Sequence, residues 1–185
     1  MLDPENPDEI IDNITIDKLK EKDFEIISNL LTQSEESLTP LQKDILTAIY
    51  WIGNAEKDTI SHDKLIKYVI ALDALLAQGR SDKSETVAKR YTAIMCQYWK
   101  DNDLIQRYCM IKTYYSIRNQ IVHGGLRYID ENILKQLRLR VSELDYNLLS
   151  YCSDHTVITD LFKNLFPVNE DLLKNVKCED NLLIV

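Results

Sequence analysis

Apolar residues recur at intervals of three and four along most of this chain, the spacing that gathers side chains on one face of an α-helix. The longest such stripe comprises Ile133, Leu137, Val141, Leu144, Leu148 and Tyr151. No alternating pattern bounded by turn residues, which would indicate strands, competes with it. The sequence therefore predicts an all-α fold, an antiparallel bundle of about five to seven helices.

Proline and glycine disfavour helix interiors, and both are confined to segment ends. No proline occurs between residues 41 and 166, and the glycines are Gly53, Gly79, Gly124 and Gly125. The pattern predicts helices over residues 15–33, 40–55, 62–77, from 82 to about 100, from 103 to the Gly124-Gly125 stop, from 130 to 151, and over 156–165.

Residues that cap helices stand at the start of several of these segments. Thr39 precedes Pro40, which suits a first helical position. We expect Ser61 to cap the helix over 62–77 and Asp130 to cap the helix from 130 to 151. Asp82 and Glu85 have the spacing of a capping box.

Length and composition predict one soluble domain. The chain has 185 residues, 45% of them hydrophobic, which is enough for a buried core. It has no apolar run of eighteen residues, so no membrane association is expected, and its acidic start lacks the features of a secretory signal. We expect a cytoplasmic protein with a leader and first helix over 1–39, a helical domain over 40–155 and a C-terminal helix and tail over 156–185.

The four cysteines are Cys96, Cys109, Cys152 and Cys178. They are widely spaced and form no Cys-x-x-Cys pair, so we expect reduced thiols in the core. Cys152 and His155 are too few to hold a structural zinc ion. The sequence therefore predicts neither a metal site nor a cofactor.

The net charge of −8 is unevenly distributed. Residues 80–140 contain 12 basic and 6 acidic residues, a net of +6, between acidic flanks. A basic block of this kind suits a surface that contacts phosphates. From charge alone, the simpler explanation is a pair of helices whose solvated faces favour Lys and Arg.

Asp73 lies within the apolar segment over 62–77, where a carboxylate needs a cation or hydrogen-bond donors. We expect Arg90 or Arg118 to supply them. A structural ion pair at the edge of the core is a simpler role for Asp73 than catalysis.

The segment before Gly124 contains Arg118, Asn119 and His123. Imidazole exchanges protons near neutral pH, and guanidinium offers a planar fork to phosphate oxygens. The same residues also suit an ordinary helix end, because cations complement the helix dipole there. Arg118 and His123 are five residues apart, about 140° around a helix. Either the last turn unwinds before Gly124, or two copies of the segment face each other across a dimer.

Arg118, Asn119 and His123 have the form Arg-Asn-x-x-x-His, which resembles the Arg-x4–6-His signature of HEPN domains. With the upstream Ala-Leu-Asp-Ala-Leu-Leu at 71–76 and the helix containing Glu85, residues 45–150 resemble an Apea-like HEPN domain. Two positions depart from the family pattern: Asp73 stands where glutamate is common, and Gly125 where some members have a modified tyrosine.

The resemblance implies an all-α domain that dimerises and cleaves RNA without metal through the ribose 2′-hydroxyl. Arg118 would bind the scissile phosphate, and His123 would act as acid or base. Asn119 would orient the histidine or the phosphate. The family implies a role in toxin–antitoxin or anti-phage defence, with RNA, a second copy of the chain, and an antitoxin or sensor domain as partners.

Other residues have secondary predicted roles. The candidate RNA contacts are Arg127, Arg138, Arg140, Lys89 and Arg90, and the candidate structural acids are Asp73 and Glu85. An alternative is a non-catalytic HEPN-like module for dimerisation or RNA binding. A third is a structural partner domain that uses the 133–151 stripe.

Overall fold

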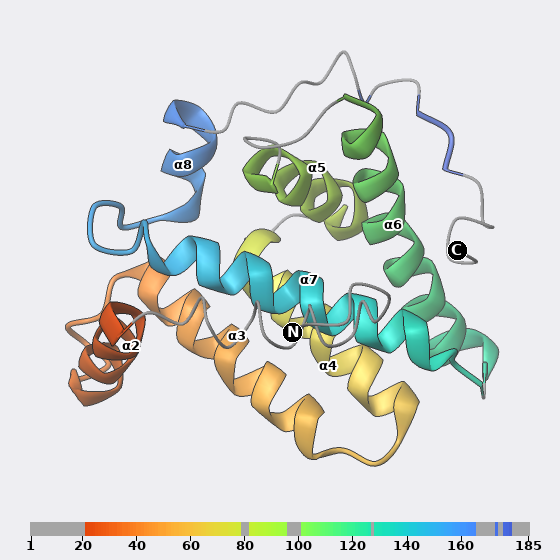
Figure 1. The fold of residues 1–185 in the computed structure, drawn as a ribbon, viewed down its shortest axis with the longest axis horizontal. Coiled ribbons are helices and arrows are strands. Elements are labelled where there is room, and N and C mark those ends of the chain that lie inside the picture. The colour runs from red at the N-terminus through yellow and green to blue at the C-terminus, as the bar shows by residue number, and fades with distance from the viewer. Residues whose placement is uncertain are drawn as a thin grey trace, which may run out of the picture. The chain divides into compact units, whose positions relative to one another are not determined.

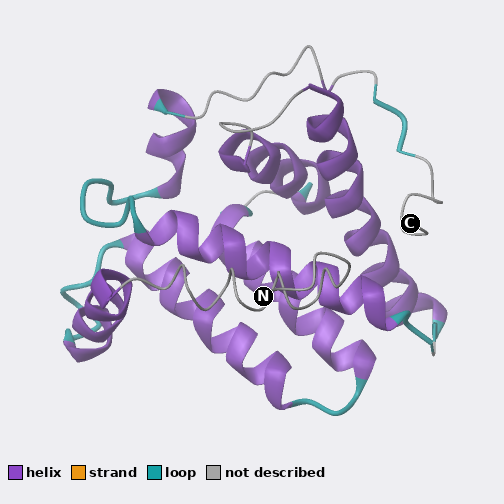
Figure 2. Cartoon of the chain, in the orientation of Figure 1, coloured by secondary structure: helices purple, strands orange, loops and turns teal. Residues whose placement is uncertain are grey.

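The computed structural model describes residues 21–78, 82–95, 101–126, 128–165, 173 and 176–178, without the side chains of 21–23 and 101–103. Within these residues the structure consists of α-helices and loops and has no strand (Figure 2). The helices are α2 (Glu21–Thr32), α3 (Pro40–Lys57), α4 (Ser61–Leu76), α5 (Lys83–Met95), α6 (Asp101–Gly124), α7 (Glu131–Leu149) and α8 (Ile158–Asn164). The predicted all-α fold is confirmed.

The chain divides into two compact units, Met1–Leu38 and Thr39–Val185. Helix α2 belongs to the first unit, and α3 to α8 belong to the second. The parts of the predicted helices over 15–20 and 96–100 lie outside the described residues.

Helix α4 is the centre of the second unit, because it contacts α3, α5, α6 and α7 (Figure 1). In the helix predicted over 62–77, the apolar residues spaced three and four apart form a stripe that is fully buried: Leu65, Val69, Leu72 and Leu76. Ala71 and Leu75 beside the stripe are fully buried as well. Burying six apolar side chains of one helix supplies a large share of the hydrophobic stabilisation. It also fixes the neighbouring helices around α4.

The helix starts explain where several boundaries fall. Thr39 and Gln42 form a reciprocal capping box, with the Gln42 amide donating to Thr39 Oγ1 at 3.3 Å and the Thr39 amide donating to Gln42 Oε1 at 2.9 Å. Asp130 caps α7 as predicted, accepting from the Asn132 amide at 2.8 Å. The prediction for Ser61 is wrong: Ile60 occupies the cap position, and Ser61 is already helical.

The prediction of reduced cysteines is wrong for one pair. Cys109, buried on α6, forms a disulfide with Cys178, with the two Cα atoms 5.0 Å apart. The partners are 69 residues apart in sequence, so tertiary folding brings them together and their spacing gave no signal. Cys152 is free and buried, as expected, and Cys96 lies outside the described residues.

Among the described residues, none of the helices combines the length and apolar character needed to cross a membrane.

Asp145 is a buried carboxyl on the core side of α7. Its side chain is 7% exposed, and no described residue makes a hydrogen bond to Oδ1. Burial disfavours the charged form and raises the pKa of Asp145 to about 8. The folded protein therefore holds a proton on this group at a pH where the unfolded chain has lost it.

We expect this difference to make stability depend on pH. Because the pKa of Asp145 is raised on folding, its favourable contribution is complete at acidic pH and is lost as the pH approaches 8. Between about pH 5 and pH 7 the loss is about 1.4 kcal/mol for each pH unit. Asp145→Asn removes this dependence, so urea unfolding at pH 5, 6 and 7 should show the variant gaining stability relative to wild type. Asp154→Asn, at an exposed carboxyl, is the control, and an equal slope for wild type and Asp145→Asn contradicts the prediction.

Candidate functional site

Helix α6 changes character along its length. Tyr108, Ile111 and Tyr115 are buried in the core, whereas no residue from Ser116 to Gly124 is buried. Even the apolar residue Val122 is 50% exposed here. The last turns of α6 therefore lie at the surface, and they contain the three residues of the predicted motif.

The end of α6 is regular. The helix continues through Gly124, and Gly125 then takes a φ of +66°, the left-handed conformation that commonly ends a helix. The Leu126 amide donates to the Gln120 carbonyl at 3.2 Å, a hydrogen bond typical of a helix that ends at a left-handed glycine. The last turn does not unwind, so the first of the two predicted arrangements is excluded.

Arg118 and Asn119 are in contact, with Arg118 Nη1 donating to Asn119 Oδ1 at 3.0 Å. Asn119 and His123 are exposed, one helical turn apart on the same face. Arg118 lies about 140° away from His123 around the regular helix. Within one chain, Arg118 and His123 therefore do not converge on a single phosphate.

Asp73 on α4 is joined to α6 just before the motif. Tyr115 Oη donates to Asp73 Oδ1 at 2.5 Å, and Lys83 Nζ lies 3.4 Å from Asp73 Oδ2. Burial, together with the charge and hydrogen bond of Asp73, raises the pKa of Tyr115, while the nearby Arg118 acts in the opposite direction. The sequence predicted Arg90 or Arg118 as the partner of Asp73, but the partners in the structure are Tyr115 and Lys83.

Glu85 joins α5 to α6. Its carboxylate accepts from Tyr108 Oη at 2.6 Å and from Lys112 Nζ at 2.9 Å, and Lys89 Nζ lies 3.3 Å away. Partial burial acts to raise the pKa of Glu85, but these hydrogen bonds and the positive charge of Lys112 outweigh it and lower the pKa. Glu85 is thus placed to hold the two helices together.

The candidate RNA contacts have different surroundings. Arg90 is 8% exposed and donates to the Leu76 carbonyl at 2.5 Å, so its burial argues against contact with phosphate. Arg140 is mostly buried and pairs with Glu143 at 2.9 Å. Arg138 is more exposed and pairs with Glu56 at 2.7 Å, and Arg127 lies outside the described residues. Lys89, which pairs with Glu85, is partly exposed.

The part of the chain that the structure describes contains no group of three or more His, Cys, Asp or Glu residues placed to bind a metal ion. Comparison with known proteins found no matching family model, no matching curated protein and no matching solved structure. The resemblance to HEPN domains therefore stays a prediction.

The hydrogen bond from Tyr115 to Asp73 was not predicted from the sequence. A signal was present, because a buried tyrosine usually needs a partner for its hydroxyl. Tyr114, the next residue, is fully buried, and its hydroxyl has no hydrogen-bond partner among the described residues. The two neighbours therefore make a matched pair.

We expect Tyr115→Phe to lower the free energy of unfolding by about 2 kcal/mol, because it removes a hydrogen bond to a charged group. Tyr114→Phe removes a buried hydroxyl without a partner and should cost little or even stabilise the protein. Urea unfolding of both variants and wild type measures the difference. Equal losses for the two variants would contradict the prediction. They would show that the hydrogen bond to Asp73 adds no more stability than a buried hydroxyl without a partner.

Proposed function

We propose that this chain is an endoribonuclease that cleaves RNA through the ribose 2′-hydroxyl without a metal ion. The observation that carries the proposal is the placement of Arg118, Asn119 and His123 on the surface turns of α6, beyond the buried part of the helix. These three residues supply a cation for phosphate, an amide that orients its neighbour, and a group that transfers protons.

The proposed reaction is an internal transfer at phosphorus. The 2′-oxygen bonds to phosphorus while the bond from phosphorus to the 5′-oxygen breaks. His123 takes the proton of the 2′-hydroxyl, and the imidazolium so formed gives a proton to the leaving 5′-oxygen. The products are a 2′,3′-cyclic phosphate and a 5′-hydroxyl, with Arg118 stabilising the charge on the phosphate.

The regular helix supports a site made by two chains. Each chain has one His123, and its own Arg118 points about 140° away. In a twofold dimer with the α6 ends facing each other, Arg118 of one chain and His123 of the other meet at the same phosphate. The proposal therefore includes a homodimer. It also includes a role as a defence or toxin effector that an antitoxin or sensor domain restrains.

The first prediction for this site is cleavage in the presence of excess EDTA. We expect wild type to cut mixed tRNA and messenger RNA and to leave cyclic-phosphate ends. Arg118→Ala and His123→Ala should each lower the rate at least about 100-fold, since each removes a group that acts in the transition state. His155→Ala, away from α6, is the matched control. If all variants bind RNA and wild type does not cut, the chain is a binding module instead.

A second prediction tests the composite site. Mixing equal amounts of Arg118→Ala and His123→Ala, after subunit exchange, makes half of the dimers mixed. Each mixed dimer has one intact pair, Arg118 from one chain and His123 from the other, so about a quarter of wild-type activity should return. A site within one chain predicts no recovery, because every chain then has one defect.

A further inference from the structure

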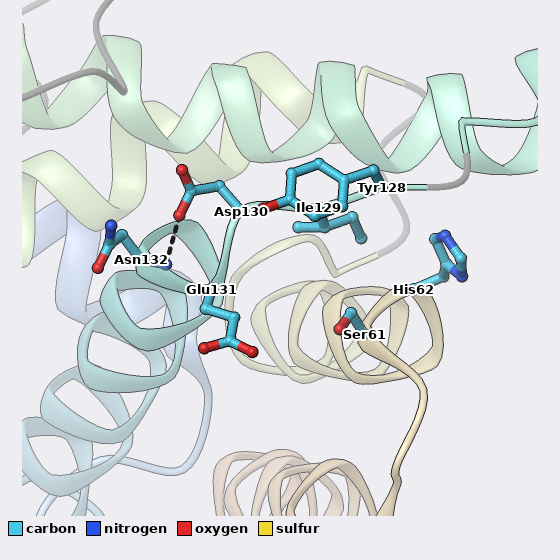
Figure 3. A pocket seen from close by; sticks show the side chains of 7 residues that line it. All are labelled: Ser61, His62, Tyr128, Ile129, Asp130, Glu131 and Asn132. Atoms are coloured by element: carbon cyan, nitrogen blue, oxygen red, sulfur yellow. Dashed lines mark hydrogen bonds between the residues drawn. The ribbon is translucent and has the colours of Figure 1, made fainter.

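A hollow lies beyond the end of α6, in the second compact unit. It has a volume of about 420 Å³ and lies between the starts of two helices (Figure 3). Ser61 and His62 line it from the first turn of α4, while the link from α6 and the first turn of α7 contribute residues 128–132. None of the residues proposed for cleavage lines it.

Two of the lining residues, Tyr128 and Glu131, have side chains that contribute little to the packing of the fold. The side chain of Tyr128 is 78% exposed, although it directly precedes the buried Ile129. Glu131 is exposed and makes no hydrogen bond or ion pair with a described residue. Asp130, in contrast, uses Oδ1 to cap α7 through the Asn132 amide. An open aromatic ring and an unpaired carboxylate therefore line the same hollow.

The chemistry of the walls selects a class of ligand. Asp130 and Glu131 repel phosphate, so an anion is not the occupant. A flat aromatic face stacks on a nucleobase, and this contact tolerates any base. A carboxylate only accepts hydrogen bonds, so it fits a base edge that offers adjacent donors. Guanine has such an edge, with N1–H beside the N2 amino group, whereas adenine, cytosine and uracil each place an acceptor beside the donor.

The hollow lies close to the proposed cleavage site. Tyr128 is five residues after His123, so the chain between them spans at most about 18 Å. The hydrogen bond from the Leu126 amide to the Gln120 carbonyl holds the first part of the link against the last turns of α6. A base in the hollow thus belongs to a nucleotide within a few positions of a phosphate at His123.

We propose that this hollow is a nucleobase subsite for a guanine of single-stranded RNA, in which Tyr128 stacks on the base and Glu131 accepts from N1–H and the N2 amino group. The subsite rests on the proposed function for its substrate, RNA. It adds a sequence preference to cleavage: the cut falls at a fixed, short distance from a guanine.

The test measures binding of the four nucleoside 5′-monophosphates by titration followed with NMR. The phosphate is common to all four ligands, so differences between them report on the base. We expect wild type to bind the guanine nucleotide about tenfold more tightly than the others. Glu131→Gln should abolish this preference, while Tyr128→Ala should weaken all four by about tenfold. Glu36→Gln and Tyr50→Ala, at an exposed acid and an exposed tyrosine elsewhere, are the matched controls.

Equal binding of the four nucleotides, or a guanine preference that survives Glu131→Gln, overturns the subsite. Mapping of cut positions in a random RNA then separates the two proposals. Cleavage with no guanine at a fixed distance overturns the subsite and leaves the nuclease standing. Guanine-selective binding lost in Glu131→Gln, without any cleavage, supports the subsite and overturns the nuclease.

Discussion

The burial of α4 is the constraint on which the rest of the second unit depends. Because this helix contacts α3, α5, α6 and α7, its apolar side chains must be covered on several sides. Asp73 lies on the same helix, at the edge of this covered region, and its carboxylate cannot be left without donors. Tyr115 of α6 meets this requirement, and its hydroxyl therefore fixes α6 against α4 three residues before Arg118. The surface motif is held in place by a core interaction.

The helix period imposes the second constraint. Spacing of three or four residues brings side chains together on a helix, but spacing of five separates them. A helix that stays regular through Gly124 cannot bring Arg118 and His123 to the same atom. This separation is the reason that the proposed site uses a second chain. The sequence contained the spacing, but the regularity of the last turn came only from the structure.

Features that depend on residues close together in the chain could be predicted from the sequence, and features that depend on distant residues could not. The stripe on α4 and the caps at Thr39 and Asp130 depend on residues within one or two helical turns, and they are present as predicted. The disulfide of Cys109 with Cys178 and the partners of Asp73 depend on residues far apart in the chain, and the sequence analysis missed them. The burial of Arg90 was also not predicted, because the packing of helices against one another decides which cations reach the surface.

The last turns of α6 and the start of α7 carry opposite charges at the surface. Arg118 is a cation suited to phosphate, and it lies on the helix itself. Glu131 is an unpaired acid beside the open ring of Tyr128, and it lies past the turn at Gly125. RNA presents the same two chemistries in alternation, since its backbone is anionic and its bases carry hydrogen-bond donors and flat faces. A carboxylate beside a phosphate site would weaken binding if both touched the backbone, but it adds selectivity where it touches a base. Under the proposed function, the left-handed turn at Gly125 separates Arg118 from Glu131, so that the two opposite charges would contact different parts of one RNA.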